Sequence, residues 1–310
     1  MHIEKRRNGY FTKGDFRMKL RKTFALLTAA VVALSLTACG GDSSSASGSG
    51  SAGGSSSVAT TSYDYSSYTG ATIDAIKEKG KLVIGTEAAY PPFEFKNLDG
   101  SFAGCDIWLA QQIADALGVK LEVMDMAFDG IIPAVQSNQV DLGIAGFTVD
   151  EERAKVIDFS DMYHKDDQLL IVRKGNESTY NSKESLAGQK VGAQRGTIQA
   201  DLIESALPDS ELFLLAKYPE LALEVTNGNI AGFVVDGAVG ASMVEANDQL
   251  AVADFAFSPE EANFGKAVVA NQQSDDLTEL VNAVIANVLA DGSFEAAYEE
   301  AKVQATELGI

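Results

Sequence analysis

The chain has 310 residues with 44 acidic and 24 basic side chains, a formal net charge of −20. Eight of the basic and two of the acidic residues precede Cys39, so a chain that starts there has 16 basic and 42 acidic residues, a net charge of about −26. This balance argues against nucleic acid or anionic lipid as a partner, because both require concentrated Lys and Arg.

The N-terminal segment, residues 1–38, has the composition of an extension followed by an export signal. From Met18 it runs from basic residues into an apolar stretch, Phe24 to Leu36, and then through small residues to Cys39. About 13 apolar residues are too few to span a bilayer but fit the core of a signal peptide. The approach to Cys39 is typical of a lipobox, in which the cysteine is lipidated and becomes the mature N-terminus. An ordinary signal peptide with a chance cysteine is the alternative.

Gly and Ser dominate the stretch that follows. All but three residues between Gly40 and Ser57 are Gly or Ser, so this segment cannot bury a core and behaves as a coil. Continued to about Thr69, it has a root-mean-square reach of roughly 30 Å. We therefore expect a protein on the outer face of the cell membrane, held through its lipid anchor and free to reorient.

From Ala71 onward, strands alternate with helices, which indicates an α/β fold with a mostly parallel sheet. The first half is predicted to contain strand Lys81–Thr86, a turn at Asn97–Gly100, helix Asp106–Leu117, strand Lys120–Met124, helix Gly130–Ser137 and strand Val140–Ala145. The same order resumes with strands Gln168–Val172 and Lys190–Ala193, helix Thr197–Ala206, strand Glu211–Leu215, helix Tyr218–Thr226, strand Ile230–Val235 and helix Asp236–Glu245. The tail is predicted as strand Phe264–Ala270 and helix Asp275–Leu289, with Ser274 as N-cap.

Cysteine and histidine offer little for catalysis or metal binding. Only Cys39 and Cys105 are present, so lipidation of Cys39 leaves no intrachain disulfide. We expect Cys105 to be a small buried residue near a strand-to-helix junction and His164 to lie at the surface or on a rim. Because the chain has no HExxH or CxxC motif, we predict no metal, no cofactor and no enzymatic activity.

The stretch Asp141–Tyr163 has the features of a binding site. A buried strand breaks at Gly146 and is followed by a hydroxyl, Thr148, and a guanidinium, Arg153. The planar guanidinium matches a carboxylate bidentately, and each charge-assisted bond contributes about 1.5–3 kcal/mol. This pattern predicts a site for a small carboxylate.

This stretch resembles the extracytoplasmic solute-binding proteins of polar amino acid ABC transporters, solute-binding protein family 3. The resemblance includes the DFSDMY run, Asp158–Tyr163, and covers roughly Lys81 to Gly292. Further motifs follow in order: GTEAAYPPFEF, CDIWLAQQIADALG, FDGIIPAVQSNQVDLGIAG, QRGT and VVDGAVG. QRGT follows a strand and opens a helix, but it lacks the GK[ST] of a nucleotide-binding loop.

The resemblance implies a two-lobed periplasmic-binding-protein-like fold of type II, with two parallel-rich sheets joined by a two-strand hinge. The chain would cross between the lobes near Gln168–Lys174 and again near Pro259–Phe264. The implied division is a Ser/Gly tether at residues 39–70, lobe 1 at 71–168 and 262–310, and lobe 2 at 169–261.

The resemblance also implies which residues hold the two charged ends of an amino acid. Arg153 would clamp the α-carboxylate, with the Thr148 hydroxyl and backbone N–H. The N–H of Thr197 or Ile198, at a helix N-terminus, would reach the same carboxylate. From the opposite side, Asp236 would pair with the ligand ammonium. The backbone of Gly146 would accept from that ammonium as well.

The walls of the site are predicted from aromatic and polar residues in the same motifs. The aromatic walls are expected to be Tyr90, Phe128 and Phe147, with Glu87 and Gln194 facing the ligand side chain. Asp129 is expected to cap the following helix. The acidic runs Asp150–Glu152 and Asp275–Asp276 are interpreted as solvated faces.

The leading hypothesis is therefore a monomeric, membrane-anchored binding protein that delivers a free L-amino acid to the permease subunits of an ABC importer. A sensor that presents its ligand to a membrane kinase or chemoreceptor is a second hypothesis. A third is a cyclohexadienyl- or arogenate-type dehydratase on the same fold, for which Glu87 is the one candidate general acid. The acidic Glu87 favours a cationic or amide side chain, and it also resembles some cystine-binding relatives.

Overall fold

The computed structural model describes residues 63–258, 261 and 264–310. The predicted signal peptide, Cys39 and the first part of the tether lie outside the described residues. Within the described part of the chain, no helix combines the length and apolarity needed to cross a membrane.

The first lobe is built on a five-stranded sheet in the order β4-β1-β5-β14-β6. Strand β1 runs parallel to its neighbours β4 and β5, whereas β14 runs antiparallel to β5 and β6. The strands are β1 (Lys81–Thr86), β4 (Lys120–Asp125), β5 (Leu142–Gly143), β6 (Asp158–Phe159) and β14 (Val269–Ala270). Because β14 comes from the tail of the chain, the tail contributes a strand to this sheet.

The second lobe repeats this plan with the order β10-β9-β11-β8-β12. Here β9 runs parallel to β10 and β11, and β8 runs antiparallel to β11 and β12. The strands are β8 (Gln168–Arg173), β9 (Lys190–Gln194), β10 (Glu211–Leu215), β11 (Gly232–Asp236) and β12 (Leu250–Ala256). The two-lobed α/β fold is confirmed, but both sheets are mixed rather than mostly parallel.

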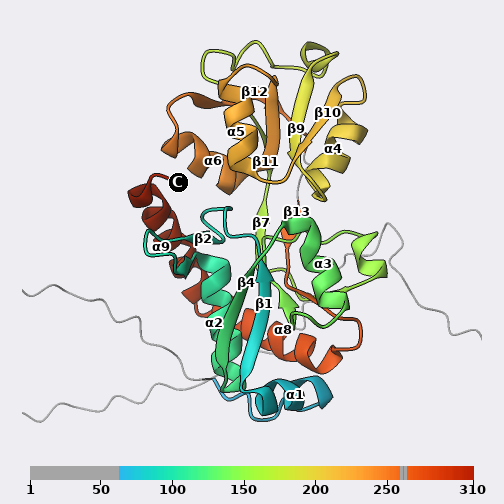
Figure 1. The fold of residues 1–310 in the computed structure, drawn as a ribbon, viewed down its shortest axis with the longest axis vertical. Coiled ribbons are helices and arrows are strands. Elements are labelled where there is room, and N and C mark those ends of the chain that lie inside the picture. The colour runs from blue at the N-terminus through green and yellow to red at the C-terminus, as the bar shows by residue number, and fades with distance from the viewer. Residues whose placement is uncertain (1–62, 259–260, 262–263) are drawn as a thin grey trace, which may run out of the picture. The chain divides into compact units, whose positions relative to one another are not determined.

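The antiparallel strands have a common position in the chain. A two-stranded antiparallel ribbon, β7 (His164–Asp166) with β13 (Phe264–Lys266), lies between the two sheets (Figure 1). Strands β6 and β8 flank β7 in sequence, and β12 and β14 flank β13. Between β6 and β8 the chain passes from the first sheet to the second through β7, with no helix between them. Strand β7 comes just before the segment Gln168–Lys174, where the crossing was predicted. Most of that predicted segment is strand β8 of the second sheet.

Helices pack on both sheets (Figure 1). Those of the first lobe are α1 (Ala71–Lys79), α2 (Cys105–Leu117), α3 (Phe128–Gln136), α8 (Asp275–Ala290) and α9 (Ser293–Leu308). Those of the second lobe are α4 (Ile198–Ala206), α5 (Tyr218–Thr226) and α6 (Gly237–Ala246). Helix α2 ends as predicted at Gly118, whose φ of 70° lets its N–H reach back to the last turn. Neither α1 nor α9 was predicted from the sequence.

Two acidic residues differ from their predicted roles. Helix α3 begins at Phe128, with Ala127 as N-cap, so Asp129 lies in the first turn and does not cap the helix. In the run Asp275–Asp276, the carboxylate of Asp276 accepts the N–H groups of Thr72 and Ile73 at 3.0 and 3.1 Å. Asp276 thus provides the acceptor for two backbone N–H groups at the N-terminus of α1, and it is not simply a solvated residue.

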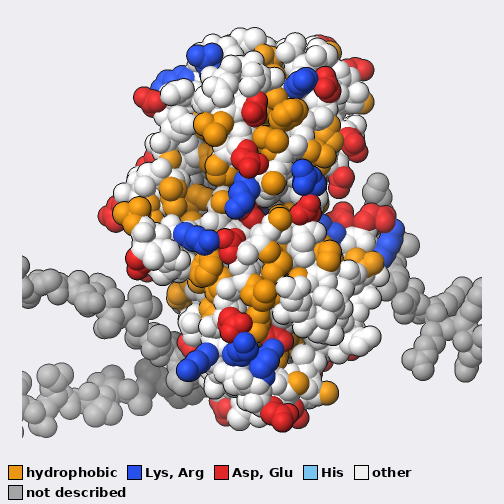
Figure 2. Space-filling model, viewed as in Figure 1, with side chains coloured by type: hydrophobic (Ala, Val, Ile, Leu, Met, Phe, Trp, Pro, Cys, Tyr) orange, Lys and Arg blue, Asp and Glu red, His pale blue; other side chains and the backbone are white. Residues whose placement is uncertain are grey.

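The face of the molecule in Figure 2 carries both acidic and basic side chains, with hydrophobic side chains exposed between them. In the first lobe the core includes the buried faces of α2 and α8; Cys105, Leu109 and Leu280 are each 0% exposed. Cys105 is thus buried at the start of α2, as predicted.

Candidate ligand-binding site

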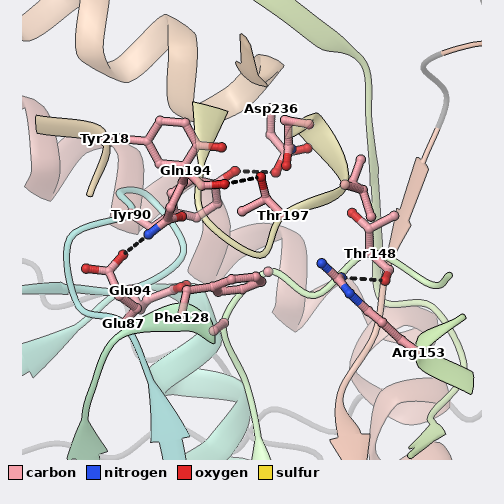
Figure 3. A pocket seen from close by; sticks show the side chains of 14 residues that line it. Glu87, Tyr90, Glu94, Phe128, Thr148, Arg153, Gln194, Thr197, Tyr218 and Asp236 are labelled. Carbon is pink, nitrogen blue, oxygen red and sulfur yellow. Dashed lines mark hydrogen bonds between the residues drawn. The ribbon is translucent and has the colours of Figure 1, made fainter. Parts of the chain in front are cut away.

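A cavity between the two lobes brings together residues that are far apart in the sequence. The cavity is lined by Glu87, Tyr90, Glu94, Phe128, Ala145, Gly146, Thr148, Arg153, Gln194, Thr197, Ile198, Gln199, Tyr218 and Asp236. Figure 3 shows Glu87 and Arg153 on opposite sides of this cavity, with Phe128 between them. Ten of the eleven ligand-contact residues proposed from the sequence lie here, and Phe147 does not.

Arg153 is positioned by its own turn. The carboxylate of Asp150 accepts the N–H groups of Glu152 and Arg153 at 3.0 and 2.9 Å, which fixes the start of the 3-10 helix Arg153–Lys155. Asp150 therefore has a local structural role that its interpretation as a solvated residue missed. The signal was an Asp three residues before the arginine, a spacing typical of helix starts.

The Arg153 guanidinium faces the cavity and contacts both lobes. Nη1 donates to the carbonyl oxygen of Thr148 at 3.1 Å, and Nη2 donates to that of Gly196 at 2.9 Å. The guanidinium carbon lies 5.6 Å from the ring centre of Phe128. Burial lowers the pKa of Arg153, but a guanidinium remains charged in proteins. With two of its five N–H donors on carbonyls, the group retains donors for an anion.

The N-terminus of α4 lies at the same cavity. Thr197 is the N-cap residue, but its hydroxyl donates to the carbonyl oxygen of Gln194 at 2.7 Å and does not cap the helix. The first-turn N–H groups from Ile198 onward therefore add their dipoles to the cavity. Arg153 and this helix start give the cavity an end that suits a carboxylate.

The opposite side of the cavity is acidic. Glu87, 1% exposed, accepts a hydrogen bond from Nε2 of Gln194 at 3.2 Å and pairs with the Lys217 ammonium at 3.3 Å. Burial raises the pKa of Glu87, and the charge of Lys217 opposes that shift. Glu94 is equally buried; burial, followed by the charge of Asp106, raises its pKa well above the usual range.

Asp236 lies at the end of β11 and is 2% exposed. Its carboxylate accepts hydrogen bonds from the Tyr90 hydroxyl, from Nε2 of Gln168 at 2.5 Å and from the ammonium of Lys266 at 2.5 Å. The same ammonium lies 3.4 Å from the carbonyl oxygen of Gly146. Lys266 thus contacts both groups to which the resemblance assigned the ligand ammonium.

Several residues of the site were missed from the sequence. Glu94, Gln199 and Tyr218 line the cavity, and Lys266 lies beside it. Glu94 stands inside the quoted GTEAAYPPFEF motif. For Lys266, the available signal was a single lysine in the otherwise apolar run FGKAVVA.

Two predicted placements are wrong. Phe147 is 0% exposed and stacks behind Phe128, with ring centres 4.7 Å apart. It supports the wall without lining the cavity, since its side chain packs in the first-lobe core with Ile131 and Val269. His164 is not a surface or rim residue: it is half-buried in β7, between the rings of Phe93 and Tyr298, and burial lowers its pKa to about 4.

Two observations bear on catalysis and metal binding. Burial raises the pKa of the Cys105 thiol well above its usual range, which disfavours the nucleophilic thiolate. Among the described residues, no group of three or more His, Cys, Asp or Glu side chains is arranged to hold a metal ion.

Comparison with known proteins identifies similar chains. Residues 82–301 match the family described as bacterial extracellular solute-binding proteins, family 3. The L-cystine-binding protein TcyJ of Escherichia coli K12 is 32% identical over 229 residues, which cover 74% of this chain and 85% of TcyJ.

Solved structures show the same fold. The amino acid ABC transporter substrate-binding protein AbpA of Streptococcus pneumoniae, bound to L-arginine, has a TM-score of 0.72 at 37% identity and covers 75% of this chain and 98% of its own. The ancestral amino acid-binding protein AncCDT-1, a precursor of cyclohexadienyl dehydratase, has a TM-score of 0.69 at 32% identity, with 74% and 99% covered.

Proposed function

Because this chain belongs to the bacterial extracellular solute-binding proteins of family 3, we propose that it captures a free L-amino acid and delivers it to the permease subunits of an ABC importer. The protein acts as a monomer on the outer face of the cell membrane. Cys39 carries its lipid anchor, and the Gly/Ser segment provides the tether. Capture takes place by closure of the two lobes about the ribbon of β7 and β13.

The observation that carries this proposal is the carboxylate end of the cavity. Arg153 and Thr148 come from the first lobe and the α4 N-terminus from the second, so a bound carboxylate contacts both lobes at once. An anion placed there gains bonds from both lobes together only when the lobes are closed. Ligand binding and closure are thereby coupled.

The opposite end of the cavity indicates the ligand side chain. Glu87 and Glu94 are buried acids that lie across the cavity from Arg153, and Phe128 and Tyr90 provide apolar walls. A long side chain with a cationic or strongly polar end satisfies this arrangement. TcyJ is named for L-cystine and AbpA was solved with L-arginine, so these two amino acids are the first candidates.

The proposal is tested by titration calorimetry of the proteinogenic amino acids and L-cystine against purified protein stripped of endogenous ligand. Arg153→Ala should weaken the best ligand by about 100-fold or more, the loss expected for charge-assisted bonds to a buried carboxylate. Arg195→Ala is the matched control, because Arg195 follows the cavity residue Gln194 in the chain, is more than half exposed and pairs with Asp129 at 3.8 Å. Equal affinity of wild type and Arg153→Ala contradicts the proposal.

The dehydratase hypothesis requires an acid that delivers a proton to a leaving group. Glu87 accepts a hydrogen bond from Gln194 and pairs with the Lys217 ammonium, and this ion pair opposes the rise in its pKa that burial causes. AncCDT-1 is described as an amino acid-binding protein and a precursor of such an enzyme, which supports binding as the function of this fold without turnover. Recovery of prephenate or arogenate unchanged after incubation is the expected result.

A further inference from the structure

Lys266 is a basic side chain at a position with almost no access to water. It is 1% exposed, and it belongs to β13 of the ribbon between the lobes. Lysine is rarely buried without a counter-ion, and here the counter-ion is Asp236, 2.5 Å away in the second lobe. The ammonium therefore joins the ribbon to the second lobe beside the cavity.

The surroundings of the Lys266 ammonium leave it well satisfied. One donor reaches Asp236, another faces the Gly146 carbonyl oxygen at 3.4 Å, and the nitrogen lies 4.8 Å from the ring centre of Phe93. An ammonium has three donors, so two acceptors and an aromatic face match its capacity. Nothing in this arrangement requires a ligand to complete it.

The acceptors themselves are also occupied. On Asp236, Oδ2 accepts from the Tyr90 hydroxyl and Lys266, and Oδ1 accepts from Gln168. A ligand ammonium placed between Gly146 and Asp236 would share these acceptors with a like charge a few ångströms away, and like charges repel strongly where water is scarce.

We propose, as a refinement that rests on the proposed function, that Lys266 is the specificity-determining residue of this site, because its ammonium fills the α-ammonium subsite from within the protein. The ligand is then recognised by its carboxylate, at Arg153, and by its side chain. Its α-ammonium is not required. The ligand class consequently includes carboxylic acids that lack the α-amino group and otherwise match an amino acid.

The proposal is tested with two ligand pairs that differ only by α-amino groups: L-arginine with 5-guanidinopentanoate, and L-cystine with 3,3′-dithiodipropionate. In whichever pair binds, titration calorimetry of the wild type should give the desamino acid a dissociation constant no more than about threefold above that of its amino acid. In Lys266→Met, the amino acid should gain about tenfold and the desamino acid should lose about tenfold, since Asp236 is left without a counter-ion unless the ligand supplies one. Lys165→Met is the matched control, because Lys165 lies on the paired strand and is exposed.

If Lys266→Met does not fold, the double variant Lys266→Met with Asp236→Asn removes both charges together and should retain the wild-type affinity for the desamino acid within about threefold. A desamino acid that binds the wild type about 100-fold more weakly than its amino acid overturns the role of Lys266 and leaves the proposed function standing. An unchanged ratio of affinities in Lys266→Met overturns it too. If no acid of either kind binds the wild type, both proposals fall.

Discussion

Glu87 of the first lobe and Lys217 of the second form an ion pair across the cavity, with Oε1 and Nζ 3.3 Å apart. Lys217 is the N-cap residue of α5 and is partly exposed, whereas Glu87 is buried. The pair therefore places a partly exposed cation where the proposed cationic end of a ligand side chain would lie.

Removal of this cation should favour cationic ligands. In Lys217→Met, Glu87 loses its ion pair, so we expect L-arginine to bind several-fold more tightly and a neutral amino acid such as L-glutamine to gain nothing. Isothermal titration of both ligands checks this. Lys190→Met is a suitable control. Like Lys217, Lys190 pairs with a glutamate, here Glu211, but this pair lies at the end of β9 that is far from the cavity. Equal changes for L-arginine and L-glutamine would contradict a role of Glu87 at the side-chain end.

The turn that holds Arg153 should be needed for affinity even though Asp150 does not line the cavity. In Asp150→Ala, the N–H groups of Glu152 and Arg153 lose their acceptor, and the guanidinium becomes less well positioned. We expect a loss of about five- to tenfold in affinity, the scale of one helix-cap interaction. Glu151→Ala, which changes the exposed neighbour, should bind as wild type does. A similar loss in both variants would indicate a general charge effect in place of a positioning effect.

The N-terminus of α1 should depend on Asp276. Asp276→Ala removes the acceptor of two backbone N–H groups and should lower the free energy of unfolding by about 0.5–2 kcal/mol. Asp275→Ala, at the exposed neighbour, should change it by less than about 0.5 kcal/mol. Urea denaturation monitored by circular dichroism measures both, and equal stability of the two variants would show that the cap is not formed in solution.

Two residues of β7, His164 and Asp166, should make the folding stability depend on pH in opposite directions. Burial lowers the pKa of His164 to about 4, below its unfolded value of about 6.5, so its contribution is complete above pH 6.5 and is lost as the pH falls toward 4. Burial raises the pKa of Asp166 from 3.8 to about 6, so its charged form opposes folding above pH 6 and this opposition is relieved as the pH falls toward 4.

Single variants separate these two contributions. Relative to wild type, His164→Phe should lose less stability between pH 6.5 and 4, because it has no buried imidazole whose protonation opposes folding. Asp166→Asn should lose more stability over the same range, because asparagine has no buried carboxylate charge that protonation could neutralise as the pH falls. Urea midpoints at pH 4, 5, 6 and 7 measure this, and a wild-type slope in both variants would contradict the two assignments.

The sequence was most informative where one segment alone determines the structure. β1, β10 and α5 have their predicted bounds, because each combines a uniform apolar pattern with clear turn residues. Helix α2 ends at Gly118 for the same local reason. The α9 helix was not predicted, although its buried residues Phe294, Ala297, Ala301 and Ala305 are spaced at helical intervals, because small alanines give a weak apolar signal.

Relationships between distant segments were beyond the reach of local patterns. The antiparallel half of each sheet depends on the path of the chain through the ribbon, which no local pattern records. Lys266 was missed because its counter-ion, Asp236, lies 30 residues earlier in the chain. A role for this lysine can be inferred only once the two side chains are known to be neighbours. Phe147 was misplaced because it stands between Gly146 and Thr148, which both line the cavity, whereas its own side chain packs in the first-lobe core.

The position of β14 between β5 and β6 has a consequence for how the chain matures during export. The second sheet is drawn from one uninterrupted stretch and can assemble as soon as that stretch emerges. Strand β6 comes much earlier in the chain than its partner β14. It can therefore join its sheet only after β14, near the C-terminus, has emerged. The earlier-made lobe is thus the last to be completed, and a chain truncated just before Val269 would keep one finished sheet and one open one.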